Sequence, residues 1–154
     1  MSDPLIMQAI ARLVPQGARV LDLGCGDGAL LAYLQQHKGC TGYGVELSDE
    51  NVHACVQRGV NVLQLNLDEG LSLFADQSFD VVLQIDTLQH LRNAETMLRE
   101  TVRVGRVGTF ADFGDLARKN QLQVMDAFGL QNGQVVRTWP NLMAGTAVYK
   151  LQRS

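Results

Sequence analysis

The segment from Val20 to Gly28 constrains the possible folds more than any other part of the chain. Its apolar stretch, Val20 to Leu23, runs directly into glycines at positions 24, 26 and 28. Glycines at alternate positions let the backbone turn tightly and approach a ligand closely, because they carry no Cβ atom. The helix-forming residues 29–36 follow at once. This order predicts a strand, a glycine turn and a helix, with a ligand site at the carboxyl end of the strand.

Strands and helices are predicted to alternate along most of the chain. Residues 79–85 show no alternation of apolar and polar positions, which is typical of a central strand covered on both faces. Further strands are expected at 19–23, 43–47, 61–65 and 106–113, and further helices at 6–14, 50–58 and 94–102. Repeated units of this length predict an α/β fold with a doubly wound, mostly parallel sheet.

The last third of the chain has a different pattern. A helix fragment is expected at 115–120, and strands at 122–128 and 144–152. No helix is predicted between these two strands, and a parallel arrangement needs such a crossover. We therefore expect an antiparallel C-terminal strand pair.

Composition limits the remaining possibilities. A chain of 154 residues suits a single domain, and its net charge of -3 gives no reason to expect nucleic acid or an anionic membrane as a partner. The three cysteines form no CxxC pair, so neither disulfides nor a metal site is expected. No apolar run approaches the roughly 18 residues of a membrane helix, and Asp3 and Pro4 stand where a basic n-region would lie, so we expect neither secretion nor membrane insertion. We expect a cytoplasmic protein with reduced thiols.

The glycine spacing bears on the ligand. A dinucleotide fingerprint GxGxxG needs its third glycine at position 29, which is Ala29, although a variant of that fingerprint ends in alanine. Asp22 and Asp27 flank the turn, whereas a pyrophosphate prefers a helix N-terminus without negative charge. A cationic sulfonium such as S-adenosylmethionine fits better, and a nicotinamide cofactor remains the alternative.

Residues at the ends of the later strands complete the predicted site. Glu46 ends the second strand and can accept both ribose hydroxyls of a nucleoside. Asn66 and Asp68 are candidates for the adenine edge, with Leu47 and Leu67 as apolar walls. The residues expected to bind the cofactor are Asp22, Leu23, Gly24, Cys25, Gly26, Asp27, Gly28, Glu46, Leu47, Asn66, Leu67, Asp68 and Gln84. Asp86 and His90 follow the fourth strand and are weaker candidates for a general base toward a methyl acceptor.

Several longer strings give the chain a specific resemblance. The segments 22–28 and 79–91, together with Glu46, resemble the motifs of class I S-adenosylmethionine-dependent methyltransferases. The strings LDLGCGDG, RGVNV, NLDEGL, TLQ, LRE and RVGR narrow the resemblance to the methionine biosynthesis protein MetW family. These strings cover most of residues 15–114. The resemblance implies a Rossmann-like methyltransferase fold, S-adenosylmethionine as cofactor and S-adenosylhomocysteine as product.

The chain departs from that family pattern in two places. The family usually has an acid where Asn66 stands, and an amide can still accept a hydrogen bond from adenine. The family is also longer between the strand ending near Phe113 and the helix beginning near Asp115. We therefore expect residues 1–154 to form one cofactor-binding domain from which a segment near 114–115 is missing.

Three functions stay open at this point, and the glycine spacing disfavours one of them, a nicotinamide-dependent oxidoreductase. Of the other two, the first is methyl transfer from S-adenosylmethionine to a small acceptor. The second, which the MetW resemblance implies, is a non-catalytic partner or regulator of a homoserine O-acyltransferase in methionine biosynthesis.

Overall fold

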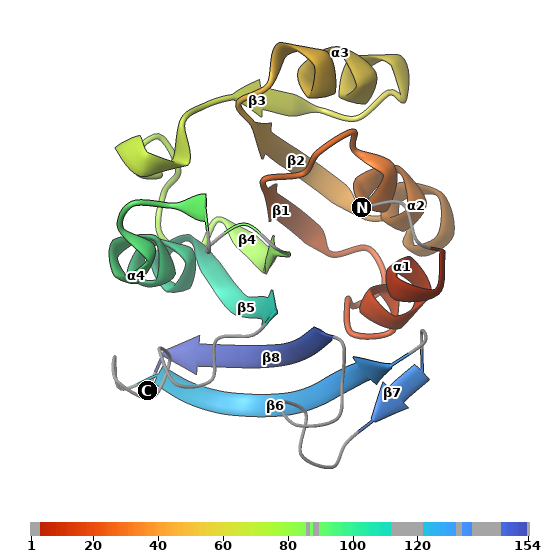
Figure 1. Cartoon of the computed structure of the whole chain (residues 1–154), viewed down its shortest axis with the longest axis vertical. Helices are drawn as coiled ribbons and strands as arrows, with labels where there is room; N and C mark the ends of the chain where they lie inside the picture. The colour runs from red at the N-terminus through yellow and green to blue at the C-terminus, as the bar shows by residue number, and fades with distance from the viewer. Residues whose placement is uncertain are drawn as a thin grey trace.

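The computed structural model describes residues 4–85, 87, 90–111, 122–131, 134–136 and 146–153. Its core is one sheet with the strand order β3-β2-β1-β4-β5-β8-β6-β7 (Figure 1). Neighbouring strands from β3 to β5 run parallel. The predicted α/β fold with a doubly wound, mostly parallel sheet is confirmed.

The observed elements lie close to the predicted ones. The parallel strands are β1 (Arg19–Leu23), β2 (Thr41–Glu46), β3 (Val62–Gln64), β4 (Phe79–Gln84) and β5 (Gly105–Ala111). The helices are α1 (Pro4–Ala11), α2 (Ala29–Lys38), α3 (Asp49–Gln57), the short 3-10 helix η1 (Leu67–Glu69) and α4 (Ala94–Val104). Among these helices, none is long and apolar enough to cross a membrane.

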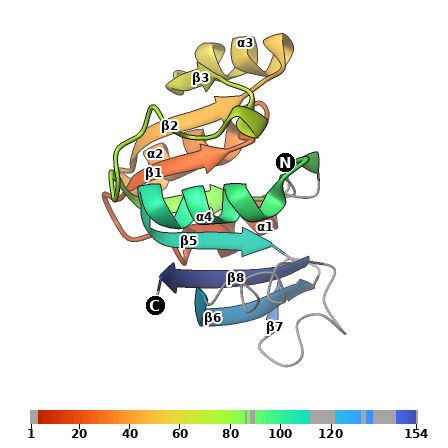
Figure 2. The ribbon, with the colours of Figure 1, turned by 90° about the vertical axis from the view of Figure 1, so that its left-hand side faces the viewer.

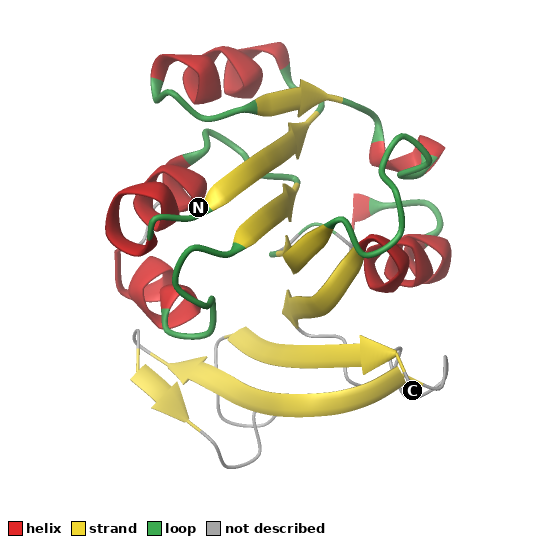
Figure 3. Ribbon diagram, turned by 180° about the vertical axis from the view of Figure 1, so that it is seen from behind, coloured by secondary structure: helices red, strands yellow, loops and turns green. Residues whose placement is uncertain are grey.

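Helices cover both faces of the parallel strands, which explains the apolar character of β1 and β4. On one face Ile10 of α1 and Leu34 of α2 pack with Val20 and Leu83. On the other face Met97 of α4 belongs to the same core cluster as Leu21, Leu23 and Val82. Figure 2 shows α4 lying along β4 and β5, and Figure 3, from behind, shows α1 and α2 on the opposite side of the sheet.

Helix α3 begins after the capping residue Ser48. The hydroxyl of Ser48 accepts a hydrogen bond from the amide of Asn51 at 3.4 Å, and Asp49 and Glu50 lie in the first turn of the helix. Acidic side chains in a first turn interact favourably with the helix dipole. The cap therefore fixes the direction in which the chain leaves the end of β2.

The C-terminal strands are β6 (Leu122–Gln131), β7 (Gln134–Val136) and β8 (Thr146–Arg153). Strand β8 lies between β5 and β6 and is antiparallel to both, and β7 is antiparallel to β6. The two strands expected at 122–128 and 144–152 correspond to β6 and β8. The expected helix at 115–120 and the expected gap near Gly114 lie outside the described residues.

Strand register brings the predicted site residues to one edge of the sheet. Leu23 at the end of β1 is level with Val45 on β2 and with Gln84 at the end of β4. Because these strands are parallel, their carboxyl ends meet at the same edge, where ligands of doubly wound folds bind. Glu46, one residue beyond Val45, therefore lies beside the glycine turn.

Candidate functional site

The glycine turn after β1 adopts the backbone that its sequence predicts. Gly24, Gly26 and Gly28 have φ angles of 74°, 57° and 77°, and Gly28 is the N-cap of α2. These angles lie in the left-handed region, which residues with a Cβ atom enter at a cost. The protein itself fills the space beside two of these glycines. A Cβ at Gly24 would contact Oγ1 of Thr87, and one at Gly28 would lie 2.9 Å from Sγ of Cys55.

Glu46 joins this turn to the end of β2. Its Oε2 accepts a hydrogen bond from the amide of Gly26 at 2.9 Å. Its Oε1 accepts from the amides of Leu47 at 2.8 Å and Ser48 at 3.0 Å. A carboxylate offers about four acceptor positions. Glu46 thus keeps roughly one position for a ligand, so a bidentate contact with two ribose hydroxyls would have to displace one of the amides.

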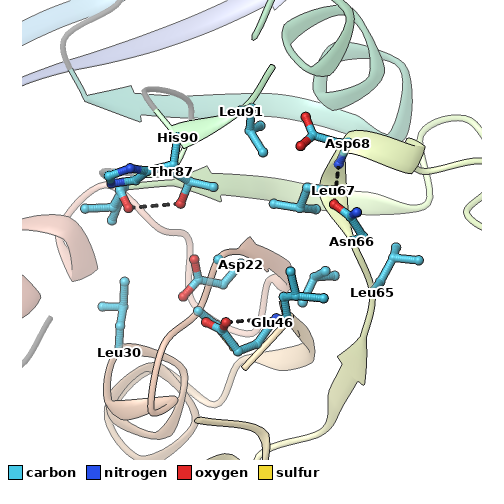
Figure 4. A pocket seen from close by; sticks show the side chains of 15 residues that line it. Asp22, Leu30, Glu46, Leu65, Asn66, Leu67, Asp68, Thr87, His90 and Leu91 are labelled. Carbon is cyan, nitrogen blue, oxygen red and sulfur yellow. Dashed lines mark hydrogen bonds between the residues drawn. The ribbon is translucent and has the colours of Figure 1, made fainter. Parts of the chain in front are cut away.

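A cavity of about 570 Å³ opens at this edge of the sheet (Figure 4). Its volume falls within the range of small-molecule sites. Nine of the predicted residues line it, namely Asp22, Gly24, Cys25, Glu46, Leu47, Asn66, Leu67, Asp68 and His90. Three of these are acids, and no lysine or arginine of the described residues lines the cavity. The cavity is therefore electrostatically suited to a cation.

Asp22 is the most deeply buried of these acids. Its side chain lies at the centre of the cavity in Figure 4, and the residue is only 4% exposed. Burial raises the pKa of Asp22 from 3.8 to about 7, and the negative charge of Glu46 adds to the rise. A cation placed beside Asp22 would oppose both effects.

Asn66 and Asp68 close one wall of the cavity. Oδ1 of Asn66 accepts a hydrogen bond from the amide of Asp68 at 3.0 Å and caps η1. Oδ1 of Asp68 accepts from the amide of Arg92 at 2.9 Å. Asp68 therefore ties the wall after β3 to the segment that precedes α4.

Other predicted residues lie away from the cavity. Asp27 points to the neighbouring helices, where it accepts hydrogen bonds from the Ala29 amide at 3.1 Å and from Arg58 at 2.7 Å. Partial burial favours a higher pKa for Asp27, but these two donors outweigh it and lower the pKa. Leu23 belongs to the core, and Gly26 and Gly28 are not among the lining residues.

Gln84 is enclosed at the end of β4 rather than open to the cavity. The residue is 1% exposed, and among the described residues neither its Oε1 nor its Nε2 has a hydrogen-bond partner. Its predicted role in cofactor binding remains a prediction. Asp86, the other candidate on this segment, lies outside the described residues.

Sequence reasoning missed six lining residues, which are Leu30, Val45, Leu65, Ile85, Thr87 and Leu91. The apolar members follow from strand ends and the first turn of α2, and each could have been found as a neighbour of a predicted residue. Thr87 follows the predicted residue Asp86, but it lies beyond β4 in a stretch without periodicity that would indicate the direction of its side chain. Within the described part of the chain no group of His, Cys, Asp or Glu is arranged to hold a metal ion, and the three cysteines are free and buried.

The fold defines the class of protein. A solved S-adenosylmethionine-dependent methyltransferase from Thermotoga maritima matches it with a TM-score of 0.78 at 19% identity, over 96% of this chain and 87% of that one. Magnesium protoporphyrin IX methyltransferase from Synechocystis, solved with bound S-adenosylmethionine, gives a TM-score of 0.69 at 17% identity, over 99% and 78%. At these identities the likeness shows the fold alone, and that fold is the methyltransferase fold.

Sequence comparison identifies the family. The model of the methionine biosynthesis protein MetW matches residues 6–108. The bifunctional methionine biosynthesis protein MetXA/MetW of Rhodopirellula baltica is 39% identical over 107 residues, which are 64% of this chain and 17% of that protein. The chain belongs to the MetW family, as its sequence strings predict. It spans less than half the length of the curated relatives that it matches.

Proposed function

We propose that this chain binds S-adenosylmethionine in the cavity at the carboxyl edge of the sheet. The observation that carries the proposal is the charge of the lining: Asp22, Glu46 and Asp68 are acids, and no described lysine or arginine accompanies them. S-adenosylmethionine carries a sulfonium and an ammonium, whereas a dinucleotide carries a doubly negative pyrophosphate. Three acids around one cavity favour the first ligand and oppose the second.

The shape of the cavity supports the same ligand. Glu46 holds the turn at Gly26 and keeps an acceptor position for a ribose hydroxyl. Leu47, Leu65 and Leu67 offer apolar surface next to Glu46, where an adenine ring fits between aliphatic side chains. Asp22 lies further along the cavity, where it favours a positive charge (Figure 4).

The activity that this site supports best is methyl transfer to a small acceptor. The bound sulfonium supplies an electrophilic methyl group and a neutral leaving group, so the chain mainly has to orient the reactants and exclude water. Ile85, Thr87, His90 and Leu91 line the side of the cavity that follows β4, and an acceptor would enter there. His90, and Asp86 beyond the described residues, remain candidates for removing a proton from a hydroxyl or amine acceptor.

A second candidate function is supported by the relative from Rhodopirellula baltica. That protein is a bifunctional MetXA/MetW chain, so a MetW part occurs covalently joined to another methionine biosynthesis part. This favours an association of the present chain with a homoserine O-acyltransferase, the partner that the family resemblance implies. In that function the cavity would sense S-adenosylmethionine as a signal of the pathway.

Calorimetry with S-adenosylmethionine, S-adenosylhomocysteine and NAD tests the binding proposal. We expect both adenosyl compounds to bind and NAD not to bind. Glu46→Ala should weaken their binding by about tenfold or more, because a hydrogen bond to a charged group is lost. Glu50→Gln, an exposed acid on α3, is the matched control and should leave the affinity unchanged.

The outcome also separates the two functions. Binding of NAD with the affinity of the adenosyl compounds, or unchanged affinity in Glu46→Ala, would show that the site assignment is wrong. Transfer of a labelled methyl group to a small acceptor supports the enzyme. Copurification with homoserine O-acyltransferase, at a ratio that depends on S-adenosylmethionine, supports the partner instead.

A further inference from the structure

Thr87 lies across the cavity from Glu46, just beyond the end of β4 (Figure 4). Its Oγ1 lies 2.8 Å from the carbonyl oxygen of Leu23 and 3.1 Å from that of Ile85. A threonine hydroxyl has one proton and donates it to one carbonyl at a time, and the shorter distance favours Leu23. The hydroxyl therefore fastens the segment after β4 to the end of β1.

This bond determines what the hydroxyl can offer a ligand. With its proton held by a backbone carbonyl, Oγ1 of Thr87 keeps lone pairs and can only accept further hydrogen bonds. Thr87 lines the cavity and is partly exposed to it. It therefore presents an acceptor to the ligand, which suits an ammonium group and does not suit a carboxylate.

The neighbouring glycine keeps the hydroxyl in this place. A Cβ atom at Gly24 would contact Oγ1 of Thr87 and would lie 2.9 Å from its Cγ2. The missing side chain at position 24 thus makes room for Thr87. Gly24 and Thr87 together form one surface of the cavity, next to Asp22.

The order of the lining residues indicates which end of the ligand reaches this surface. In Figure 4 Glu46 and Thr87 lie on opposite sides, with Asp22 between them. With the ribose held at Glu46, as proposed above, the amino-acid end of the ligand extends past Asp22 toward Thr87. The acceptor on Thr87 is then within the part of the cavity that receives the α-ammonium.

We propose that Thr87 positions the amino-acid end of bound S-adenosylmethionine by accepting a hydrogen bond from the α-ammonium, while its own proton is held by the carbonyl oxygen of Leu23. This inference rests on the proposed function and adds a residue to the site. Thr87 contacts the cofactor in this assignment and takes no part in proton transfer.

Calorimetry with two ligands tests the assignment. S-adenosylhomocysteine has the amino-acid end, and 5'-methylthioadenosine lacks it but keeps the nucleoside and the sulfur. Thr87→Val has nearly the shape of threonine without the hydroxyl, and should weaken S-adenosylhomocysteine binding by about tenfold or more with little change for methylthioadenosine. Thr87→Ser keeps the hydroxyl and should bind both ligands within about threefold of the wild type. Thr96→Val, an exposed threonine of α4, is the control and should change neither affinity.

The pattern across the two ligands decides between the possible roles. Equal losses for both ligands in Thr87→Val would assign Thr87 a structural role and overturn the proposal, and so would unchanged binding of both. If the wild type binds neither compound, the proposed function itself is wrong and this assignment falls with it. Should Thr87→Val fail to fold, Thr87→Ala measured with the same two ligands gives the same decision.

Discussion

Replacing Gly24 with alanine tests, without any ligand, how tightly the glycine turn packs against Thr87. Gly24 has a φ of 74°, and its Cβ would contact Oγ1 of Thr87 and lie 2.9 Å from Cγ2 and 3.2 Å from Cβ of the same residue. Gly17 is a matched control, because its φ is 69° and a Cβ there would meet no atom of the described residues within 4 Å. The two substitutions share the backbone strain and differ only in the contact.

The expected magnitudes follow from these two contributions. An alanine in the left-handed region costs about 1–2 kcal/mol, and this is the whole effect expected for Gly17→Ala. At position 24 the crowding against Thr87 adds about 1–3 kcal/mol, as for other additions to a packed interior. Gly24→Ala should therefore lower the free energy of unfolding by about 2–5 kcal/mol.

Urea unfolding followed by far-UV circular dichroism measures both values, since the midpoint and slope give the free energy of unfolding. The double variant Gly24→Ala/Thr87→Ala adds a second measurement. It removes Oγ1 and Cγ2 of Thr87, so part of the crowding should disappear and the two substitutions should be non-additive. Equal destabilisation by Gly17→Ala and Gly24→Ala, within about 0.5 kcal/mol, would refute the tight contact between Gly24 and Thr87.

Two further predictions concern Arg103 and Asp22. The guanidinium of Arg103 donates hydrogen bonds to the carbonyls of Leu71 and Phe74 and to the carboxylate of Glu100 at 2.9–3.0 Å. Arg103→Lys should therefore lower the free energy of unfolding by about 1–3 kcal/mol. Arg106 is exposed, and Arg106→Lys, the control, should lower it by less than about 0.5 kcal/mol. A similar loss for both arginines would contradict the role of Arg103. The pKa of Asp22 is raised by burial from 3.8 to about 7, so the native state retains a proton that the unfolded chain releases, and stability falls as the pH rises from about 4 to 7 by up to about 4 kcal/mol. Urea unfolding at pH 5 and at pH 7.5 measures this loss, which Asp22→Asn should not show. If the free energy of unfolding of the wild type rises between these pH values relative to that of Asp22→Asn, the raised pKa of Asp22 is refuted.

The sequence predicts the parallel part of the fold because its signals are local and strong. Strand β1 begins and ends where the apolar run 19–23 does, and the three glycines adopt the left-handed backbone expected of them. The amphipathic segment 94–102 forms α4, which continues to Val104. Once the strand order is assumed, the carboxyl ends of β1 and β2 bring Asp22 and Glu46 to one site without further information.

Side-chain direction limits what the sequence can predict about the site. Asp27 flanks the glycine turn just as Asp22 does, yet it pairs with Arg58 of a neighbouring helix end, 31 residues away in sequence. No spacing rule relates these two residues, so a ligand role for Asp27 could not be distinguished from an ion pair. Thr87 was missed for a related reason, since its importance depends on a carbonyl 64 residues earlier in the chain.

Contacts within the protein hold two sides of the cavity, and this affects how binding measurements are interpreted. Glu46 bonds the amide of Gly26, and Thr87 bonds the carbonyl of Leu23, so two sides of the cavity are fixed by contacts within the protein. Groups that are fixed in advance lose less conformational entropy when a ligand binds. The same contacts mean that Glu46→Ala removes structure as well as a ligand contact. Glu46→Gln has one oxygen acceptor, so its NH2 group would face either the Gly26 amide or the amides of Leu47 and Ser48, and a loss of affinity in this variant combines the lost negative charge with a changed turn.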